Sequence, residues 1–201
     1  RTQVRDNVPV DEIVRRLLTA QGSTFREGPA NFFRIGTTAP DWAEATSQVF
    51  LGVRLQCAKC HHHPFEKWSQ DDYHGLAACF VRVGTKPSQE YGLFGRETVI
   101  FLRPEGEARH PRRGTIVKPQ ALDGPPLDDG EDRRERLAEW IVSPENPFFA
   151  RNIVNRVWAH FMGRGFTQPV DDFGEHNPVT HPELLDRLAP GFVTAGYDLR
   201  K

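Results

Sequence analysis

The chain has 201 residues, of which 38% are hydrophobic and 26% are charged, so it is long enough for one domain or two small ones with a packed core. Its 26 Lys and Arg nearly cancel its 27 Asp and Glu, and a net charge of −1 leaves no electrostatic footprint for nucleic acid or an anionic membrane. No apolar run approaches the roughly 18–20 residues that cross a bilayer, so we expect no transmembrane segment.

Helical patterns dominate the first part of the chain. Hydrophobic residues recur at helical spacing over residues 10–21, and a second helix is expected over residues 41–51, with Asp41 as a possible N-cap. Residues 69–83 begin with a helix-start pattern in which Ser69 is the expected N-cap. These elements predict a helical first segment.

The composition changes after residue 84, where Pro and Gly become frequent. Residues 97–103 and 114–119 have the pattern of short strands, and residues 125–135 have that of an exposed linker. We therefore expect a small β insertion near residues 93–120.

Helices are expected again after the linker. One covers residues 133–142, and the strongest helical pattern of the chain follows over residues 147–162. A last helix is expected to open at residues 181–183, with Thr180 as its cap.

The most specific motif is CAKCH at residues 57–61, the C-x-x-C-H sequence of c-type haem attachment. In such a motif two thiols, here Cys57 and Cys60, reach the two vinyl groups of one porphyrin. The imidazole of His61 would then point at the iron. We therefore expect one haem c, held by two thioether bonds with His61 as the proximal ligand.

Zinc is the main alternative cofactor. His61, His62 and His63 follow the two thiols, and Cys79 or another His could complete a set of four ligands. No second C-x-x-C is present to form the usual zinc pattern, however. The pair is also compatible with a redox dithiol. Three Cys in total make a poor disulfide framework, because one is always left over.

Several other side chains are candidates for metal ligation. His63 could ligate a metal, hydrogen-bond a haem propionate or satisfy a carbonyl in the core. For the sixth iron position the candidates are Met162, which is the single Met, and His160, His176 and His181. Met162 could instead be a core residue, and His181 could instead cap a helix. If none of them ligates, a five-coordinate iron could bind a small molecule.

A weaker cluster of acids follows in the last third of the chain. Asp171, Asp172 and Glu175 could form an acid pair or bind a cation, although such clusters are more often solvated loops or caps. Arg156, on the preceding helix, could buttress one of these acids.

Residues 50–80 resemble a domain of the planctomycete cytochrome C domain protein family, large secreted proteins of unknown function. Cys79 departs from the family pattern, since it stands where the family usually has Phe. The residues that fall on the pattern are Cys57, Cys60, His61, His63, Pro64, Phe65, Trp68, Gln70, Asp72 and Tyr73.

Residues 146–199 resemble the start of the domain that follows in the same proteins. The matching residues are Asn155, Arg156, Trp158, Asp171, Asp172, Phe173, Asn177, His181 and Pro182. The resemblance implies an exported redox protein, located in the periplasm, outside the cell or at the cell surface. It also implies that the chain is an internal piece of a larger polypeptide. It implies no established reaction.

The fold class that we predict is mainly α: a helical haem- or metal-binding domain with a small β insertion and a second helical segment. We expect the domain with the C-x-x-C-H motif, incomplete at its N-terminus, over residues 1–90. Residues 91–130 would form the β insertion and linker, and residues 131–201 the start of a C-terminal helical domain.

The leading functional hypothesis is electron transfer by one haem c to or from a redox partner protein. The second is an exported enzyme that uses a haem or a metal, with polysaccharide-derived material as a conceivable substrate. The third is a module with a structural zinc site. The sequence leaves open whether the chain is an enzyme. We also expect the two family-like segments to pack together, which would bring His181 or residues 171–173 near residues 57–63.

Overall fold

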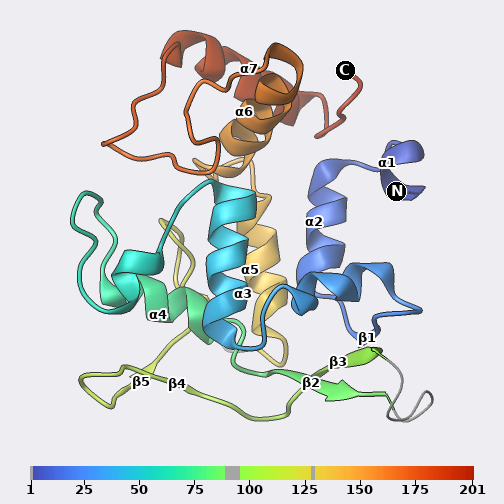
Figure 1. The fold of residues 1–201 in the computed structure, drawn as a ribbon, viewed down its shortest axis with the longest axis vertical. Coiled ribbons are helices and arrows are strands. Elements are labelled where there is room, and N and C mark those ends of the chain that lie inside the picture. The colour runs from blue at the N-terminus through green and yellow to red at the C-terminus, as the bar shows by residue number, and fades with distance from the viewer. Residues whose placement is uncertain (1, 89–95, 128–129) are drawn as a thin grey trace.

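The computed structural model describes residues 2–88, 96–127 and 130–201, and Figure 1 shows the order of its elements. The structure is 43% helical and has small antiparallel sheets, so its class is mixed α/β where the sequence predicted mainly α. The helices are α1 (Thr2–Arg5), α2 (Val10–Leu18), α3 (Ala39–Thr46), α4 (Gln70–Ala78), α5 (Arg133–Ile141), α6 (Phe149–Met162) and α7 (Pro182–Thr194), joined by the 3-10 helices η1 (Gly28–Arg34) and η3 (Gln56–Lys59) and the π-helical turn η2 (Ser47–Leu51).

The hydrophobic core forms where α2 packs against α5 and α3 packs against α4 (Figure 1). Leu18 of α2, Tyr73 and Leu76 of α4, and Leu137 of α5 are each completely buried. Burying a side chain of this size contributes roughly 1.5–3 kcal/mol, so these apolar faces hold the helices together.

Helix α3 continues into η2, which leads the chain towards the C-x-x-C-H motif. The hydroxyl of Thr38 accepts a hydrogen bond from the Asp41 amide at 3.4 Å, and the Asp41 carboxylate accepts one from the Thr38 amide at 2.9 Å. Asp41 is therefore the third helical residue of a capping box, and the N-cap is Thr38. The chain leaves η2 at Gly52, whose φ of 68° lies in the left-handed region that favours glycine.

The larger sheet has the strand order β1–β3–β2, with β1 (Gly22–Ser23), β2 (Val83–Pro87) and β3 (Thr98–Leu102). Strand β3 confirms the strand predicted at 97–103. It pairs with β1 and β2, which lie outside the predicted insertion. A strand of two residues such as β1 has no period to detect, which is why the sequence did not predict it.

The second sheet is a small hairpin of β4 (Ala108–Arg109) and β5 (Ile116–Val117), which packs against α4. Strand β5 falls inside the strand predicted at 114–119. The hairpin is important for the site because it brings basic side chains to the end of the C-x-x-C turn.

Helices α6 and α7 pack against each other at one end of the molecule (Figure 1). The segment after α7 returns to the N-terminal residues, where the Val10 amide donates to the Tyr197 carbonyl at 3.1 Å and Asn7 Nδ2 donates to Asp198 Oδ1 at 2.8 Å. Both ends of the described chain therefore lie on the same side of the fold. Among the described residues, none of the helices combines the length and the apolar character needed to cross a membrane.

Candidate functional site

Cys57 and Cys60 lie at the surface, in and directly after the single 3-10 turn η3. Ala58, between them, is completely buried, and so are Val53 and Leu55 just before the turn. Because Ala58 points into the core, the cysteines on either side of it point outward. Both thiols are exposed, and neither takes part in a disulfide.

The geometry of this turn places the two thiols on one face. The Cys60 amide donates to the Cys57 carbonyl at 3.4 Å, which is the i+3 to i hydrogen bond of a 3-10 helix. In such a turn the side chains at i and i+3 eclipse each other, and a rise of about 2 Å per residue sets their Cα atoms about 6 Å apart. A disulfide bridges Cα atoms at about this separation.

Neighbouring elements hold the turn from three sides. Arg112, from the β4–β5 hairpin, donates from Nη2 to the Cys60 carbonyl at 2.8 Å. Gln70, at the start of α4, donates from Nε2 to the Lys59 carbonyl at 3.1 Å. The ammonium of Lys59 lies 3.9 Å from Glu44 Oε1 of α3. These contacts fix the backbone of the turn and leave the face with the thiols open.

Glu44 also links the turn to the core. It accepts a hydrogen bond at 2.6 Å from the hydroxyl of Tyr73, whose side chain is completely buried. Burial raises the pKa of Tyr73 far above its ordinary value, and the hydrogen bond to Glu44 raises it further. Tyr73 is therefore a permanent hydrogen-bond donor beneath the turn.

The three histidines that follow the cysteines have local contacts. His61 is exposed, and its Nδ1 lies 2.5 Å from the carbonyl oxygen of His62. The amide of His63 donates to the Trp68 carbonyl at 2.8 Å, and His63 Nδ1 accepts from the Phe65 amide at 3.3 Å. His63 thus shapes the loop between η3 and α4.

The predicted cofactors, haem c and its alternative zinc, are wrong for this structure. Across the three described segments, no three or more His, Cys, Asp and Glu side chains are grouped so that they could hold a metal ion. A structural zinc needs about four such ligands around one point. Cys57, Cys60 and His61 are exposed. Cys79 is buried, and its thiol donates to the Gly75 carbonyl at 3.7 Å.

Met162 and His181, two of the predicted metal ligands, lie together in another cavity. They line a volume of about 350 Å³ that also includes Trp158 and none of residues 57–63. Met162 is 62% exposed, so it is not the core residue of the alternative interpretation. His181 occupies the N-cap position of α7 but makes no capping hydrogen bond with its side chain.

The acids of the second family-like segment dock onto the first segment. Asp171 accepts hydrogen bonds from Gln48 Nε2 at 2.5 Å and from Arg54 Nη2 at 2.7 Å. Burial alone would raise the pKa of Asp171, but these two hydrogen bonds, together with the charge of Arg54 and a backbone hydrogen bond, hold the pKa below its ordinary value. Arg156, which we expected to buttress an acid, donates to the Gln48 carbonyl at 2.8 Å.

A histidine completes this junction in a role that sequence analysis missed. His176 lies between two carboxylates, with Nδ1 2.7 Å from Glu66 Oε1 and Nε2 3.3 Å from Asp172 Oδ2. The hydrogen bonds to Glu66 and then to Asp172 raise the pKa of His176 above its ordinary value. Glu66 and His176 are 110 residues apart, so no local pattern could have paired them. The two segments therefore pack together, as expected, on both sides of the C-x-x-C-H motif.

Comparison with known families gives two matches. Residues 1–85 match the family model PSCyt2, described as a protein of unknown function (DUF1549), and residues 133–201 match PSD1, described as a protein of unknown function (DUF1553). Both names are typical of planctomycete proteins with cytochrome c domains, and the two successive matches indicate a part of a larger polypeptide. No curated protein and no solved structure matches the chain.

Proposed function

We propose that the chain is a thiol–disulfide module of a larger exported polypeptide, in which Cys57 and Cys60 cycle between a dithiol and a disulfide. The observation that carries the proposal is the pair of free, exposed thiols on one face of η3. The resemblance to planctomycete cytochrome C domain proteins supports export, and an exported dithiol meets an environment in which disulfides form and persist.

The reaction needs only a partner that carries a disulfide. One of the two cysteines, as its thiolate, attacks a sulfur of the partner disulfide, and the other partner sulfur leaves as a thiol after it takes up a proton. The second cysteine then loses its proton and attacks the mixed disulfide, which releases the second partner thiol. One partner S–S bond is exchanged for one bond between Cys57 and Cys60, and two electrons pass to the partner. The expected redox partner is therefore a protein or small molecule with an accessible disulfide.

The third cysteine is excluded from this chemistry by its position. Cys79 is buried, and burial raises the pKa of its thiol to about 12. It is accordingly the natural control for experiments on the exposed pair.

The test is a redox titration of the purified chain in glutathione buffers, followed by acid quenching, alkylation and measurement of the intact mass. We expect reversible loss of two alkylatable thiols within one monomer, with a midpoint in the range of about −120 to −270 mV that exchange-active C-x-x-C pairs span. Cys57→Ser and Cys60→Ser should each abolish the transition, whereas Cys79→Ser should preserve it. Failure to form the bond in any buffer, or oxidation only to dimers, would refute the proposal.

A further inference from the structure

The guanidinium of Arg112 lies beside the dithiol pair. Its Nη2 donates to the Cys60 carbonyl oxygen at 2.8 Å. Four covalent bonds join this oxygen to the Cys60 sulfur, so standard bond lengths place Nη2 within about 8 Å of that sulfur. This is no more than about one Debye length at physiological ionic strength, so the charge of Arg112 acts on a molecule that approaches Cys60.

Acids beside the turn have other cations as partners. Glu44 lies 3.9 Å from the ammonium of Lys59, and Asp71 forms an ion pair with the guanidinium of Arg113. Arg112 is exposed, and within the described segments its guanidinium contacts a neutral carbonyl and no carboxylate. Its positive charge is therefore available to a ligand.

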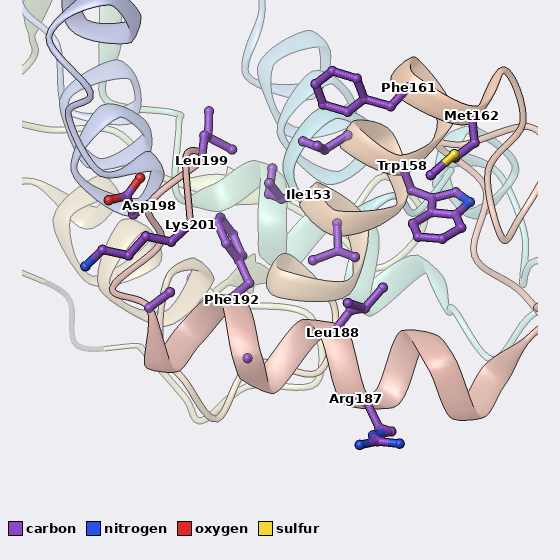
Figure 2. Close-up of a pocket in the computed structure, with 14 residues that line it drawn as sticks. Ile153, Trp158, Phe161, Met162, Arg187, Leu188, Phe192, Asp198, Leu199 and Lys201 are labelled. Atoms are coloured by element: carbon purple, nitrogen blue, oxygen red, sulfur yellow. The ribbon is translucent and has the colours of Figure 1, made fainter.

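An apolar cavity between α6, α7 and the segment that follows α7 is separate from the dithiol pair. It has a volume of about 530 Å³, and its lining includes neither exposed cysteine nor Arg112. Figure 2 shows that its walls include Ile153, Trp158, Leu188 and Phe192. Because both thiols are exposed, a disulfide meets them at an open surface, where charged groups can orient it.

The chemistry of a guanidinium indicates which disulfides it would orient. Its N–H donors form a planar fork that pairs with a carboxylate through two hydrogen bonds, and the contact with Cys60 leaves Nε and Nη1 of Arg112 open. A carboxylate two carbons away from a sulfur lies within about 5 Å of it, and a hydrogen bond adds about 2.9 Å. We propose that Arg112 is a specificity-determining residue, and that the preferred oxidants are small disulfides with a carboxylate near the sulfur.

This inference rests on the proposed thiol–disulfide exchange and names its substrate class. The Cys60 thiolate attacks one sulfur of the anchored disulfide, and the other half leaves as a thiol after it takes up a proton. Cys57 then loses its proton and attacks the Cys60 sulfur of the mixed disulfide, which releases the second half as a thiol in the same way. The substrate gains the two electrons that the cysteine pair loses, and Arg112 only holds the carboxylate.

The test compares three small disulfides that differ in charge. Dithiodipropionate carries two carboxylates, hydroxyethyl disulfide is neutral and cystamine carries two ammonium groups. The reduced chain is mixed with an excess of each, and the loss of alkylatable thiols is followed by acid quenching and intact mass. The three disulfides differ in intrinsic reactivity, so each rate is compared between wild type and variant, where that reactivity cancels.

Removal of the charge should affect the three disulfides differently. Arg112→Gln should lower the rate with dithiodipropionate by about fivefold, because an exposed ion pair of roughly 1 kcal/mol is lost. It should leave the rate with hydroxyethyl disulfide unchanged and raise the rate with cystamine. Arg112→Lys should retain most of the preference, and Arg112→Glu should reverse it.

Arg109 provides the matched control on the same hairpin. Its Nη1 donates to the Gly114 carbonyl at 3.0 Å, and Arg109→Gln should leave all three rates unchanged. Added salt should slow the reaction of dithiodipropionate more in the wild type than in Arg112→Gln. Circular dichroism verifies that each variant is folded.

Two results would overturn this inference and leave the exchange reaction intact. An equal effect of Arg112→Gln on all three disulfides would mean that Arg112 only holds the turn. Equal effects of Arg109→Gln and Arg112→Gln on dithiodipropionate would mean that the charge of the whole hairpin acts and not Arg112. If the wild type forms no bond between Cys57 and Cys60 with any of the three disulfides, the exchange reaction itself is refuted, and this inference with it.

Discussion

At the scale of single residues, Gly52 is a position where the two halves of the chain come into close contact. A Cβ atom on Gly52 would lie 2.7 Å from the ring of Phe173 and 2.8 Å from Asn152 Oδ1. The Gly52 carbonyl also accepts a hydrogen bond at 2.7 Å from the Phe173 amide. The absence of a side chain here thus lets the loop with the acids reach the residues before the dithiol turn.

Replacement of Gly52 by Ala should destabilise the protein by about 2 kcal/mol or more, because a methyl group adds both a steric clash and a left-handed backbone strain. The measurement is the free energy of unfolding in urea. Gly28→Ala is the matched control, since nothing lies within 4 Å of a Cβ at Gly28. A cost of Gly52→Ala no larger than that of Gly28→Ala would contradict the close approach.

At the scale of elements, the start of α4 sets the end of the loop that follows the dithiol turn. The hydroxyl of Ser69 accepts from the Asp72 amide at 3.2 Å, and the carboxylate of Asp72 accepts from the Ser69 amide at 2.8 Å. Ser69→Ala should lower the free energy of unfolding by about 1 kcal/mol. Because the two side chains form one capping box, Ser69→Ala with Asp72→Ala should cost less than the sum of the single changes, and strict additivity would argue against the box.

The elements also show how far sequence reasoning reaches. Ser69 was predicted correctly because its hydroxyl and the acids after it form a local pattern. Asp41 was predicted as the N-cap of α3 but is the third helical residue of its capping box. An Asp near a helix start fits both positions, so the sequence alone did not separate them. For Cys57 and Cys60, the sequence located the motif but not its exposure, which depends on Ala58 being drawn into the core. The cofactor prediction failed because, in the described part of the chain, no three His, Cys, Asp and Glu side chains come together to hold a metal ion.

At the scale of the whole molecule, contacts between residues far apart in sequence unite the two family-matched segments. Asp171 binds Gln48 and Arg54, which precede the dithiol turn, and His176 binds Glu66, which follows it. The loop of the second segment therefore contacts the chain on both sides of the turn. None of these pairs follows from periodicity or capping, and only the tertiary structure could reveal them. Because His176 lies between Glu66 and Asp172 at this junction, we expect the stability of the molecule to depend on pH.

The charge of His176 determines the direction of that dependence. Glu66 and Asp172 raise its pKa in the folded state above the ordinary value of 6.5. Arg54 Nη1 lies 3.9 Å from Asp172 Oδ2 and is a second cation on that carboxylate. Protonated His176 therefore stabilises the folded state fully below pH 6.5, and this contribution is lost as the pH rises through the raised folded pKa.

Urea unfolding of the wild type and His176→Gln between about pH 5 and pH 9 measures this contribution to the free energy of unfolding. The variant should be the less stable protein at acidic pH, and the difference should shrink towards alkaline pH. In the background of Glu66→Gln the same comparison should give a smaller acidic difference, because one of the two carboxylates that stabilise the imidazolium is gone. A difference that stays constant across the range would mean that His176 acts by packing and not by charge.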